Sequence, residues 1–295
     1  MTENNGMEYN ISIAGVVLRI QTDQQLPMTD AFRPFLTDRA PDYTAKFRCV
    51  EALPELDDRV LFEGSCYRVH PDGSRSFFDA PQDPAAYALA RTWYDRALVQ
   101  IDYLSRGARC VSRMENSFFH LGFEGLLIRR DRICFHASCI RTERGGILFS
   151  GPSGIGKSTQ AELWCRHRGA ELVNGDRPIL HRSDDGFLAW GSPYAGSSRC
   201  HINTSVPVNA LVFLAQEPEN RIRRLGTGEA FRRIYAGLTI HSWDREFMDR
   251  AVSLAAELAA AVPCYELGCV PDETAVAFLE QQLELDCCRH PGATV

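Results

Sequence analysis

The clearest pattern near the start of the chain is an alternation of apolar and polar residues. Residues 9–20 read Tyr-Asn-Ile-Ser-Ile-Ala-Gly-Val-Val-Leu-Arg-Ile, and this partial alternation is typical of a half-buried strand. Residues 60–69 are similar, and the turn-forming run Pro71-Asp72-Gly73-Ser74 that follows them predicts a hairpin. Residues 85–97 instead carry apolar side chains at helical spacing, which predicts a helix.

From residue 118 onward, stretches with helical spacing alternate with short apolar stretches. Helices are predicted over residues 118–128, 157–168, 227–237 with Thr227 as cap, 247–258, and from Pro271 toward the end of the chain. Strands are predicted over residues 133–140, 146–149, 170–173, 179–182, 187–190 and 208–215. The short strand over residues 170–173 leads to its end at Asp176. The pattern predicts an α/β domain with a mixed sheet over residues 118–295, preceded by a smaller, strand-rich α+β domain over residues 1–117.

Composition and charge narrow the classes of partner. The chain has 295 residues, of which 45% are hydrophobic and 24% are charged, as in folded globular proteins. Its formal net charge of −6 argues against nucleic acid as a partner, because binding to a phosphate backbone needs a clustered excess of Lys and Arg. The basic run at residues 221–224 is interpreted as a solvated strand face, with a phosphate contact as the alternative.

Targeting signals and cysteine use point to the cytoplasm. The first ten residues lack the basic start and apolar run of a signal peptide, and the chain has no apolar run long enough to cross a membrane. The eleven cysteines are an odd number and include no Cys-x-x-Cys pair, so we expect reduced thiols and no structural metal. A cytoplasmic protein without a membrane partner is therefore expected.

Residues 151–158 carry the strongest chemical signal. They read Gly-Pro-Ser-Gly-Ile-Gly-Lys-Ser, which matches G-x-x-x-x-G-K-[ST] between a predicted strand and a predicted helix. In such a P-loop, glycines let backbone N–H groups converge on phosphate oxygens, Lys157 neutralises the β- and γ-phosphates, and Ser158 offers its hydroxyl to Mg²⁺. We therefore expect ATP and Mg²⁺ to bind, with a glycine turn without a ligand as the alternative. The predicted nucleotide contacts come from Gly151, Ser153, Gly154, Ile155, Gly156, Lys157, Ser158 and Thr159.

A phosphate-binding loop needs a carboxylate to hold the metal or to accept a proton. Asp176 is the candidate for both roles, because a strand parallel to the P-loop strand would deliver it beside the phosphates. The alternative is that Asp176 caps the turn at residues 174–176. His136 precedes the P-loop strand and is a catalytic candidate, although a lone strand histidine is more often a buried structural residue.

Three segments together resemble the catalytic domain of HPr kinase/phosphorylase. They are His136-Ala137-Ser138-Cys139-Ile140, the glycine-rich run over residues 145–158, and Leu172-Val173-Asn174-Gly175-Asp176. The resemblance covers residues 118–283 and implies the nucleotide-binding core shared with phosphoenolpyruvate carboxykinase, with ATP as phosphate donor and a serine hydroxyl as acceptor. In that family one aspartate of a pair is the general base and the other lies near the metal. This chain has Gly175-Asp176, so one member of the pair is replaced, and Asp176 must serve both needs or receive help from another residue.

The amino-terminal part does not resemble the regulatory domain of HPr kinase. Divergent relatives that accompany peptide-modifying systems or phosphorylate small hydroxyl compounds are the closer comparison, so the acceptor is expected to be a peptide, a protein or a small molecule. We assign its choice to residues 1–117 as a hypothesis. Residues 193–199 are similar to a proline-aromatic-x-glycine segment of those relatives, which makes Arg199 a candidate for substrate binding, with a surface arginine as the alternative. Asp184 and Asp185 are interpreted as a hairpin turn.

The function expected from these observations is that of an ATP-dependent kinase for a hydroxyl group. The alternative from another class is a nucleotide-binding regulatory module with little or no phosphate transfer. A carboxykinase-like enzyme fits less well, because the chain is short for that family and no matching substrate site is found. The choice between ATP and GTP, and the oligomeric state, including a homo-oligomer, are left open by the sequence.

Overall fold

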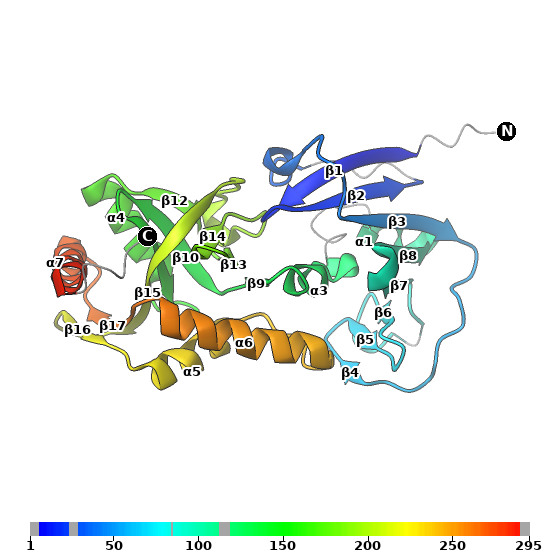
Figure 1. Ribbon diagram of the computed structural model, residues 1–295. Coiled ribbons are helices and arrows are strands. Elements are labelled where there is room, and N and C mark those ends of the chain that lie inside the picture. Colours follow the sequence, from blue (N-terminus) through cyan, green and yellow to red (C-terminus); the bar gives the residue numbers. More distant parts are fainter. Residues whose placement is uncertain (1–5, 24–28, 84, 112–118, 290–295) are drawn as a thin grey trace. The chain divides into compact units, whose positions relative to one another are not determined.

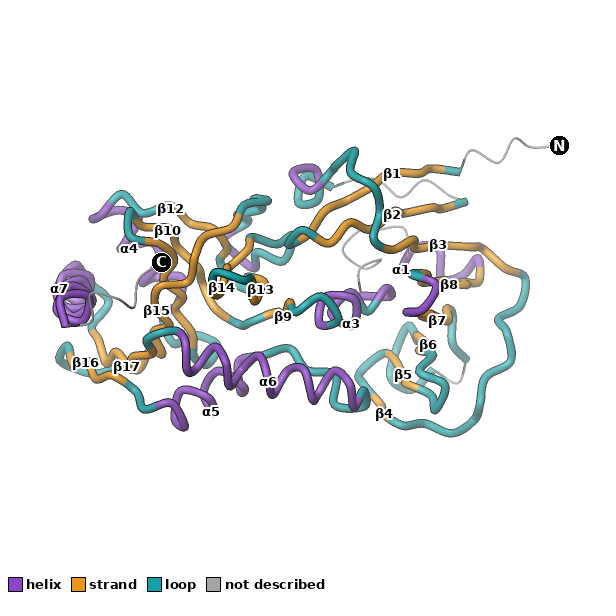
Figure 2. The backbone as a smooth tube through the Cα atoms, in the orientation of Figure 1, coloured by secondary structure: helices purple, strands orange, loops and turns teal. Residues whose placement is uncertain are grey.

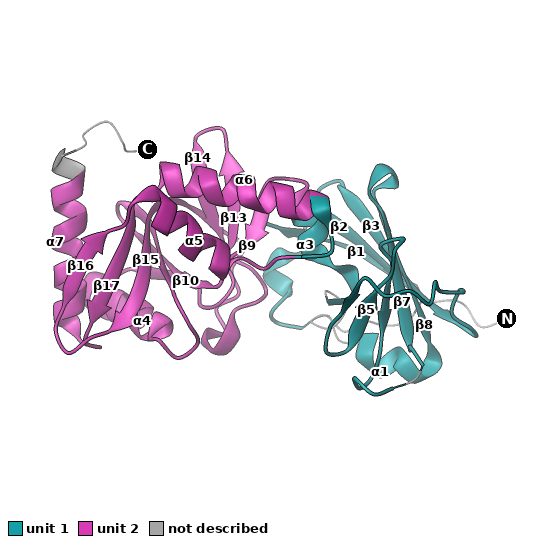
Figure 3. Cartoon of the chain, turned by 90° about the horizontal axis from the view of Figure 1, so that it is seen from below, with its two compact units in different colours: residues 1–127, 241–245 teal, residues 128–240, 246–295 magenta. Residues whose placement is uncertain are grey.

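The chain forms two compact units (Figure 3). The computed structural model describes residues 6–23, 29–83, 85–111 and 119–289. Unit 1 consists of Met1–Leu127 and His241–Arg245, and unit 2 consists of Ile128–Ile240 and Glu246–Val295. Among the described residues, no helix is long and apolar enough to span a membrane.

Unit 1 is built around an eight-stranded sheet in the order β1-β2-β3-β8-β7-β6-β5-β4. The alternating pattern over residues 9–20 forms a hairpin rather than one strand, because Ala14 and Gly15 take left-handed φ values of 50° and 78° between β1 and β2. The strands are β1 (Met7–Ile13), β2 (Val16–Thr22), β3 (Tyr43–Val50), β4 (Phe62–Glu63), β5 (Tyr67–Val69), β6 (Arg75–Phe77), β7 (Ala88–Trp93) and β8 (Leu98–Leu104). Two short helices also lie here, α1 (Ala108–Val111) and α3 (Phe123–Ile128), the latter within the predicted helix over residues 118–128, whose first residue lies outside the described part.

The predicted helix over residues 85–97 is wrong. These residues form β7, followed by a short 3-10 turn, and β7 pairs with β8 on one side and β6 on the other. Ala88, Leu89 and Ala90 are consecutive and all buried, so sheet pairing decides their conformation rather than the helical spacing. The hairpin predicted at residues 71–74 is confirmed, since it joins β5 to β6.

Unit 2 is a mixed α/β unit around a nine-stranded sheet (Figure 1). The main strand order is β12-β10-β11-β15-β14-β13-β9, and β17 joins the sheet beside β15 with β16 outside it. Its strands are β9 (Arg132–Cys134), β10 (Ala137–Thr142), β11 (Gly145–Ser150), β12 (Glu171–Asn174), β13 (Ile179–Ser183), β14 (Gly186–Trp190), β15 (Ser205–Gln216), β16 (Arg221–Arg224) and β17 (Cys264–Cys269). Its long helices are α4 (Lys157–Arg168), α5 (Thr227–Gly237), α6 (Arg245–Ala261) and α7 (Glu273–Arg289).

The sheet of unit 2 has an apolar cluster on each face. One cluster joins the sheet to α5 and α6 and includes Ile234, Phe247 and Leu254. The other joins it to α4 and α7 through Trp164 and Leu279, among others. Figure 2 shows α5 and α6 close together and apart from α4. Both faces are thus covered by helices, which is the layered arrangement expected for an α/β unit.

Several boundaries differ from the sequence-based expectation. The strand predicted over residues 133–140 is divided, because Phe135 and His136 carry the chain from β9, which pairs with β13, to β10, which pairs with β11. Thr227 is the first residue of α5, and Gly226 is its N-cap. Pro271 precedes α7 rather than beginning it, and Asp272 accepts a hydrogen bond of 2.9 Å from the backbone N–H of Thr274.

Residues next to the ends of three strands lie at one edge of the sheet. β10 lies between β11 and β12 and is antiparallel to both, so β11 and β12 run in the same direction. β12 was expected to pair directly with β11, but β10 separates the two strands. The direct parallel neighbour of β11 is β15. The ends of β11 and β12 and the start of β10 lie at the same edge of the sheet. His136 directly precedes β10, Gly151 directly follows β11, and Asp176 comes shortly after β12.

Candidate functional site

The glycine-rich loop between β11 and α4 contains three glycines with positive φ values. Gly151, Gly154 and Gly156 have φ values of 144°, 78° and 114°, which L side chains rarely adopt. An added Cβ at Gly154 or Gly156 would meet no atom within 4 Å, so conformation rather than crowding requires glycine there. Gly156 is the N-cap of α4, and no side chain caps this helix end. The first N–H groups of α4 are thus left for an anion.

Lys157 folds back over the loop. Its Nζ donates hydrogen bonds of 2.9 Å and 3.0 Å to the carbonyl oxygens of Gly151 and Pro152. The side chain is 8% exposed, and burial lowers its pKa while the charge of Asp176 opposes that shift. The ammonium group is therefore held at the start of the loop by two backbone carbonyl oxygens. Of the other predicted nucleotide contacts, Ser153, Gly154, Ser158 and Thr159 are exposed and Gly151, Ile155 and Gly156 are half-buried.

His136 and Asp176 are brought together at this edge. His136 Nδ1 lies 3.1 Å from Asp176 Oδ1, and both side chains are about one-third exposed, at 34% and 31%. The contact lacks hydrogen-bond geometry, and Nδ1 has no hydrogen-bond partner among the described residues. Burial, and then the nearby charge of Lys157, lower the pKa of His136. A neutral imidazole therefore lies beside the carboxylate at neutral pH.

Asn174 is a structural residue of the site that the sequence reasoning missed. Its buried Oδ1 accepts hydrogen bonds from the backbone N–H groups of Asp176 and Arg177, at 2.9 Å and 2.7 Å. Its Nδ2 donates to the backbone oxygen and Oγ of Ser192, at 3.3 Å and 3.2 Å. The turn is therefore held by Asn174, which disagrees with the alternative that Asp176 caps it. The Asn-Gly pair was the available sequence signal, since Asn side chains often close such turns.

Gly175 leaves no room for a side chain. A Cβ added there would lie 2.2 Å from Ser198 Oγ, 2.5 Å from Ser198 Cβ and 3.2 Å from the carbonyl oxygen of Ala195. The position at which the resembled family carries an aspartate is thus packed against the segment over residues 195–198. Asp176 is left as the carboxylate of this turn.

The segment over residues 193–199 lies beside Asp176, but Arg199 does not provide the nearest cation. A Cβ added at Gly196 would lie 2.8 Å from Asp176 Cβ, so the backbone there touches the aspartate. Arg199 is exposed, with a left-handed φ of 51°, and forms no ion pair within the described part of the chain. Arg177 lies near this carboxylate, with Nε 3.8 Å from Asp176 Oδ2. Substrate binding by Arg199 stays a prediction.

The donor set fits magnesium held jointly with phosphates. Within the described residues, no group of three or more His, Cys, Asp or Glu side chains is placed to hold a metal ion. Mg²⁺ usually keeps several waters and takes one or two protein ligands together with substrate phosphates. The hydroxyl of Ser158 and the carboxylate of Asp176 are suited to such a shared site. Asp184 and Asp185 form the two-residue turn between β13 and β14, as predicted, and lie outside this group.

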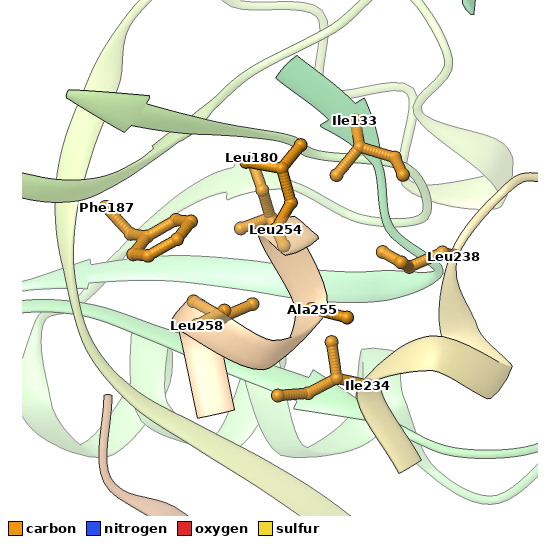
Figure 4. Close-up of a pocket in the computed structure, with 8 residues that line it drawn as sticks. All are labelled: Ile133, Leu180, Phe187, Ile234, Leu238, Leu254, Ala255 and Leu258. Carbon is orange, nitrogen blue, oxygen red and sulfur yellow. The ribbon is translucent and has the colours of Figure 1, made fainter. Parts of the chain in front are cut away.

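A small space in unit 2 is lined by apolar side chains. It is lined by side chains of β9, β13, β14, α5, α6 and the residue after α5, namely Ile133, Leu180, Phe187, Ile234, Leu238, Leu254, Ala255 and Leu258 (Figure 4). Seven of these eight residues belong to the cluster under α5 and α6, and Leu238 packs against it. This space is part of the core and offers no group to a phosphate.

Comparisons with known proteins find likenesses among solved structures only. A scan of the sequence against protein-family models finds no match, and a search of curated proteins finds none either. Among solved structures, the Hpr(Ser) kinase/phosphatase from Coxiella burnetii is similar at 15% sequence identity and a TM-score of 0.33. The alignment covers 52% of this chain and 97% of that chain. A likeness at this level carries no argument about function, so the residues of the site must carry it.

Proposed function

We propose that unit 2 binds ATP with Mg²⁺ and transfers the γ-phosphate to a hydroxyl group of a peptide, protein or small molecule. The observation that supports this best is the meeting of the glycine-rich loop, Lys157 and the His136–Asp176 pair at one edge of the sheet. A phosphate-binding loop alone would serve many classes of nucleotide-binding protein. A carboxylate beside it adds the group that phosphate transfer to a hydroxyl requires.

Each residue has a role in this proposal. The loop N–H groups and Lys157 hold the phosphates, and Ser158 with Asp176 holds Mg²⁺ between them. When bound, Mg²⁺ neutralises charge on the β- and γ-phosphates. Asp176 accepts the proton of the incoming hydroxyl, and the neutral ring of His136 lies beside the carboxylate, with Nδ1 3.1 Å from Oδ1.

A regulatory nucleotide-binding module is the second candidate. The crowding at Gly175 favours this second candidate. Proton transfer needs a carboxylate and metal binding needs a carboxylate, but the turn has space for a single one. Such a module would bind Mg-ATP without consuming it. Incubation with labelled ATP and a cell extract distinguishes the two candidates, because only a kinase yields a labelled acceptor.

The first prediction concerns nucleotide binding itself. Lys157→Ala should weaken Mg-ATP binding by at least about tenfold, because a charge-assisted contact to the phosphates is lost. Isothermal calorimetry with Mg-ATP measures this. Lys46→Ala is the matched control, since Lys46 is an exposed residue of β3 in unit 1 and should not alter affinity. Absence of heat and of thermal stabilisation with the wild-type protein would refute both candidate functions.

A further inference from the structure

Arg177 is the best-anchored cation beside the candidate site. Its backbone N–H donates a 2.7 Å hydrogen bond to Asn174 Oδ1, and its carbonyl oxygen accepts one of 2.7 Å from Ser192 Oγ. Both acceptor and donor are buried side chains. The Cα of Arg177 is therefore fixed directly after Asp176, and only the side chain is free to choose a direction.

The direction of the side chain is set by Thr239. Arg177 Nη1 donates a 2.9 Å hydrogen bond to Thr239 Oγ1, across 62 positions of sequence. Thr239 is held in turn, because its backbone N–H donates a 3.0 Å bond to the carbonyl oxygen of Cys134, at the end of β9. The guanidinium group is thereby supported at a fixed distance from Asp176, with Nε 3.8 Å from Oδ2.

The Arg177–Asp176 pair contributes little as a structural ion pair. The separation of 3.8 Å is long, and the two side chains are 43% and 31% exposed. Pairs of this kind are weak because water screens them and long side chains lose freedom. A guanidinium group has five N–H donors, and the contact to Thr239 uses one of them. Asn174 and Ser192 therefore hold in place a residue whose guanidinium group still has N–H donors and a positive charge for a ligand.

We infer that Arg177 contacts the transferred phosphoryl group as a catalytic residue and that Thr239 is its positioning residue. The inference rests on the proposed function. In the step, the acceptor oxygen forms a bond to the γ-phosphorus, the bond from that phosphorus to the bridging oxygen breaks, and ADP leaves. The acceptor proton passes to Asp176. Arg177 exchanges no proton; it stabilises the charge that spreads over the three γ-oxygens.

A transition-state analogue tests this without knowledge of the acceptor. Mg-ADP affinity is measured by calorimetry in the absence and presence of aluminium fluoride, which takes the place of the transferred group. The wild-type protein should bind Mg-ADP more tightly when fluoroaluminate is present. Arg177→Ala should keep its affinity for Mg-ADP alone within about twofold and lose at least about tenfold of the gain from fluoroaluminate.

Three further variants make the test specific. Arg177→Lys should restore part of the gain, because a point charge remains without the planar donor fork. Thr239→Val should lose a smaller part, since the guanidinium is kept but no longer held. Arg166→Ala should behave as wild type, because Arg166 is exposed in the last turn of α4 and forms no ion pair among the described residues. Melting temperatures show whether each variant is folded.

The possible failures are distinguishable. If Arg177→Ala retains the whole fluoroaluminate gain while Lys157→Ala loses Mg-ADP binding, the inference is wrong and the proposed nucleotide site stands. The inference is also wrong if fluoroaluminate adds nothing to the wild-type affinity for Mg-ADP. If the wild-type protein binds neither Mg-ADP nor Mg-ATP, both the proposed function and the inference about Arg177 are wrong.

Discussion

At the scale of single residues, the central feature is a neutral histidine beside an aspartate. Burial and Lys157 lower the pKa of His136, so its ring does not carry the charge that would bind Asp176 tightly. The carboxylate is instead placed through the backbone, because Asn174 fixes the turn and the carbonyl oxygen of Asp176 accepts a 3.0 Å bond from Ala137 N–H. Asp176 is therefore fixed in position while its side chain remains available to a proton or a metal.

Asp176→Asn separates these two roles. If Asp176 is the proton acceptor, the variant should keep its Mg-ATP affinity within about threefold and lose roughly 10²–10⁴-fold in turnover of labelled ATP, which is the usual contribution of general-base catalysis. Calorimetry and turnover are measured on the same preparation. A parallel loss of Mg-dependent affinity would show that Asp176 holds the metal, and an unchanged turnover would remove it from the mechanism.

At the scale of elements, the site depends on how the turn after β12 packs against residues 195–198. Gly175 and Gly196 both lie in this contact, one facing Ser198 and the other facing Asp176. The main obstacle at Gly175 is the Cβ of Ser198, which is fixed to the backbone and cannot rotate away. The two segments must therefore move apart to admit any side chain at position 175.

Gly175→Ala should destabilise the protein by about 1–3 kcal/mol, as overpacking commonly does. Adding Ser198→Gly should recover most of that loss, because it removes both atoms that lie within 2.5 Å of the new Cβ. Gly228→Ala is the control: Gly228 lies in α5 with no atom within 4 Å of an added Cβ, so alanine should stabilise the helix by up to about 1 kcal/mol. Melting temperatures are measured for the wild type, Gly175→Ala, Ser198→Gly, the double variant and Gly228→Ala; additive effects at positions 175 and 198 would contradict the packing argument.

At the scale of the whole molecule, partly buried histidines make stability depend on pH. Burial, and then the charge of Arg132, lower the pKa of His181 from 6.5 to about 4. The unfolded chain therefore takes up this proton below about pH 6.5, while the folded chain resists it until about pH 4. The stability that the neutral ring contributes is present above this window and is lost as the pH falls through it. The lowered pKa of His136 acts in the same direction.

His181→Gln should therefore lose less stability than the wild type when the pH is lowered from about 7 to about 5. Denaturant unfolding at several pH values between these limits gives the two slopes. The shift has its main cause in burial rather than in a specific hydrogen bond, since His181 Nδ1 has no hydrogen-bond partner among the described residues. Equal slopes for the two proteins would show that His181 does not contribute to the acid sensitivity.

The sequence by itself determined the features that depend on neighbouring residues. The bounds of α4 and the end of α5 were predicted as they are, and so was the β13–β14 hairpin, because helix periodicity, glycine ends and two-residue turns are local signals. The glycine-rich loop belongs to this group, since its conformation needs glycines at set positions. His136 and Asp176 were named as candidates from the sequence, but β12 was expected directly beside β11, whereas β10 lies between them.

Only the tertiary structure decided which distant segments meet. Strand pairing turned residues 88–93 into β7 although their spacing is helical, and it placed β10 between β11 and β12. It also brought Ser192 onto Asn174 and Thr239 onto Arg177, across 18 and 62 positions of sequence. Such contacts depend on which surfaces are buried together, and no local pattern of residues encodes that. The sequence therefore specified the glycine-rich loop, while the packing of the sheet placed the groups around it.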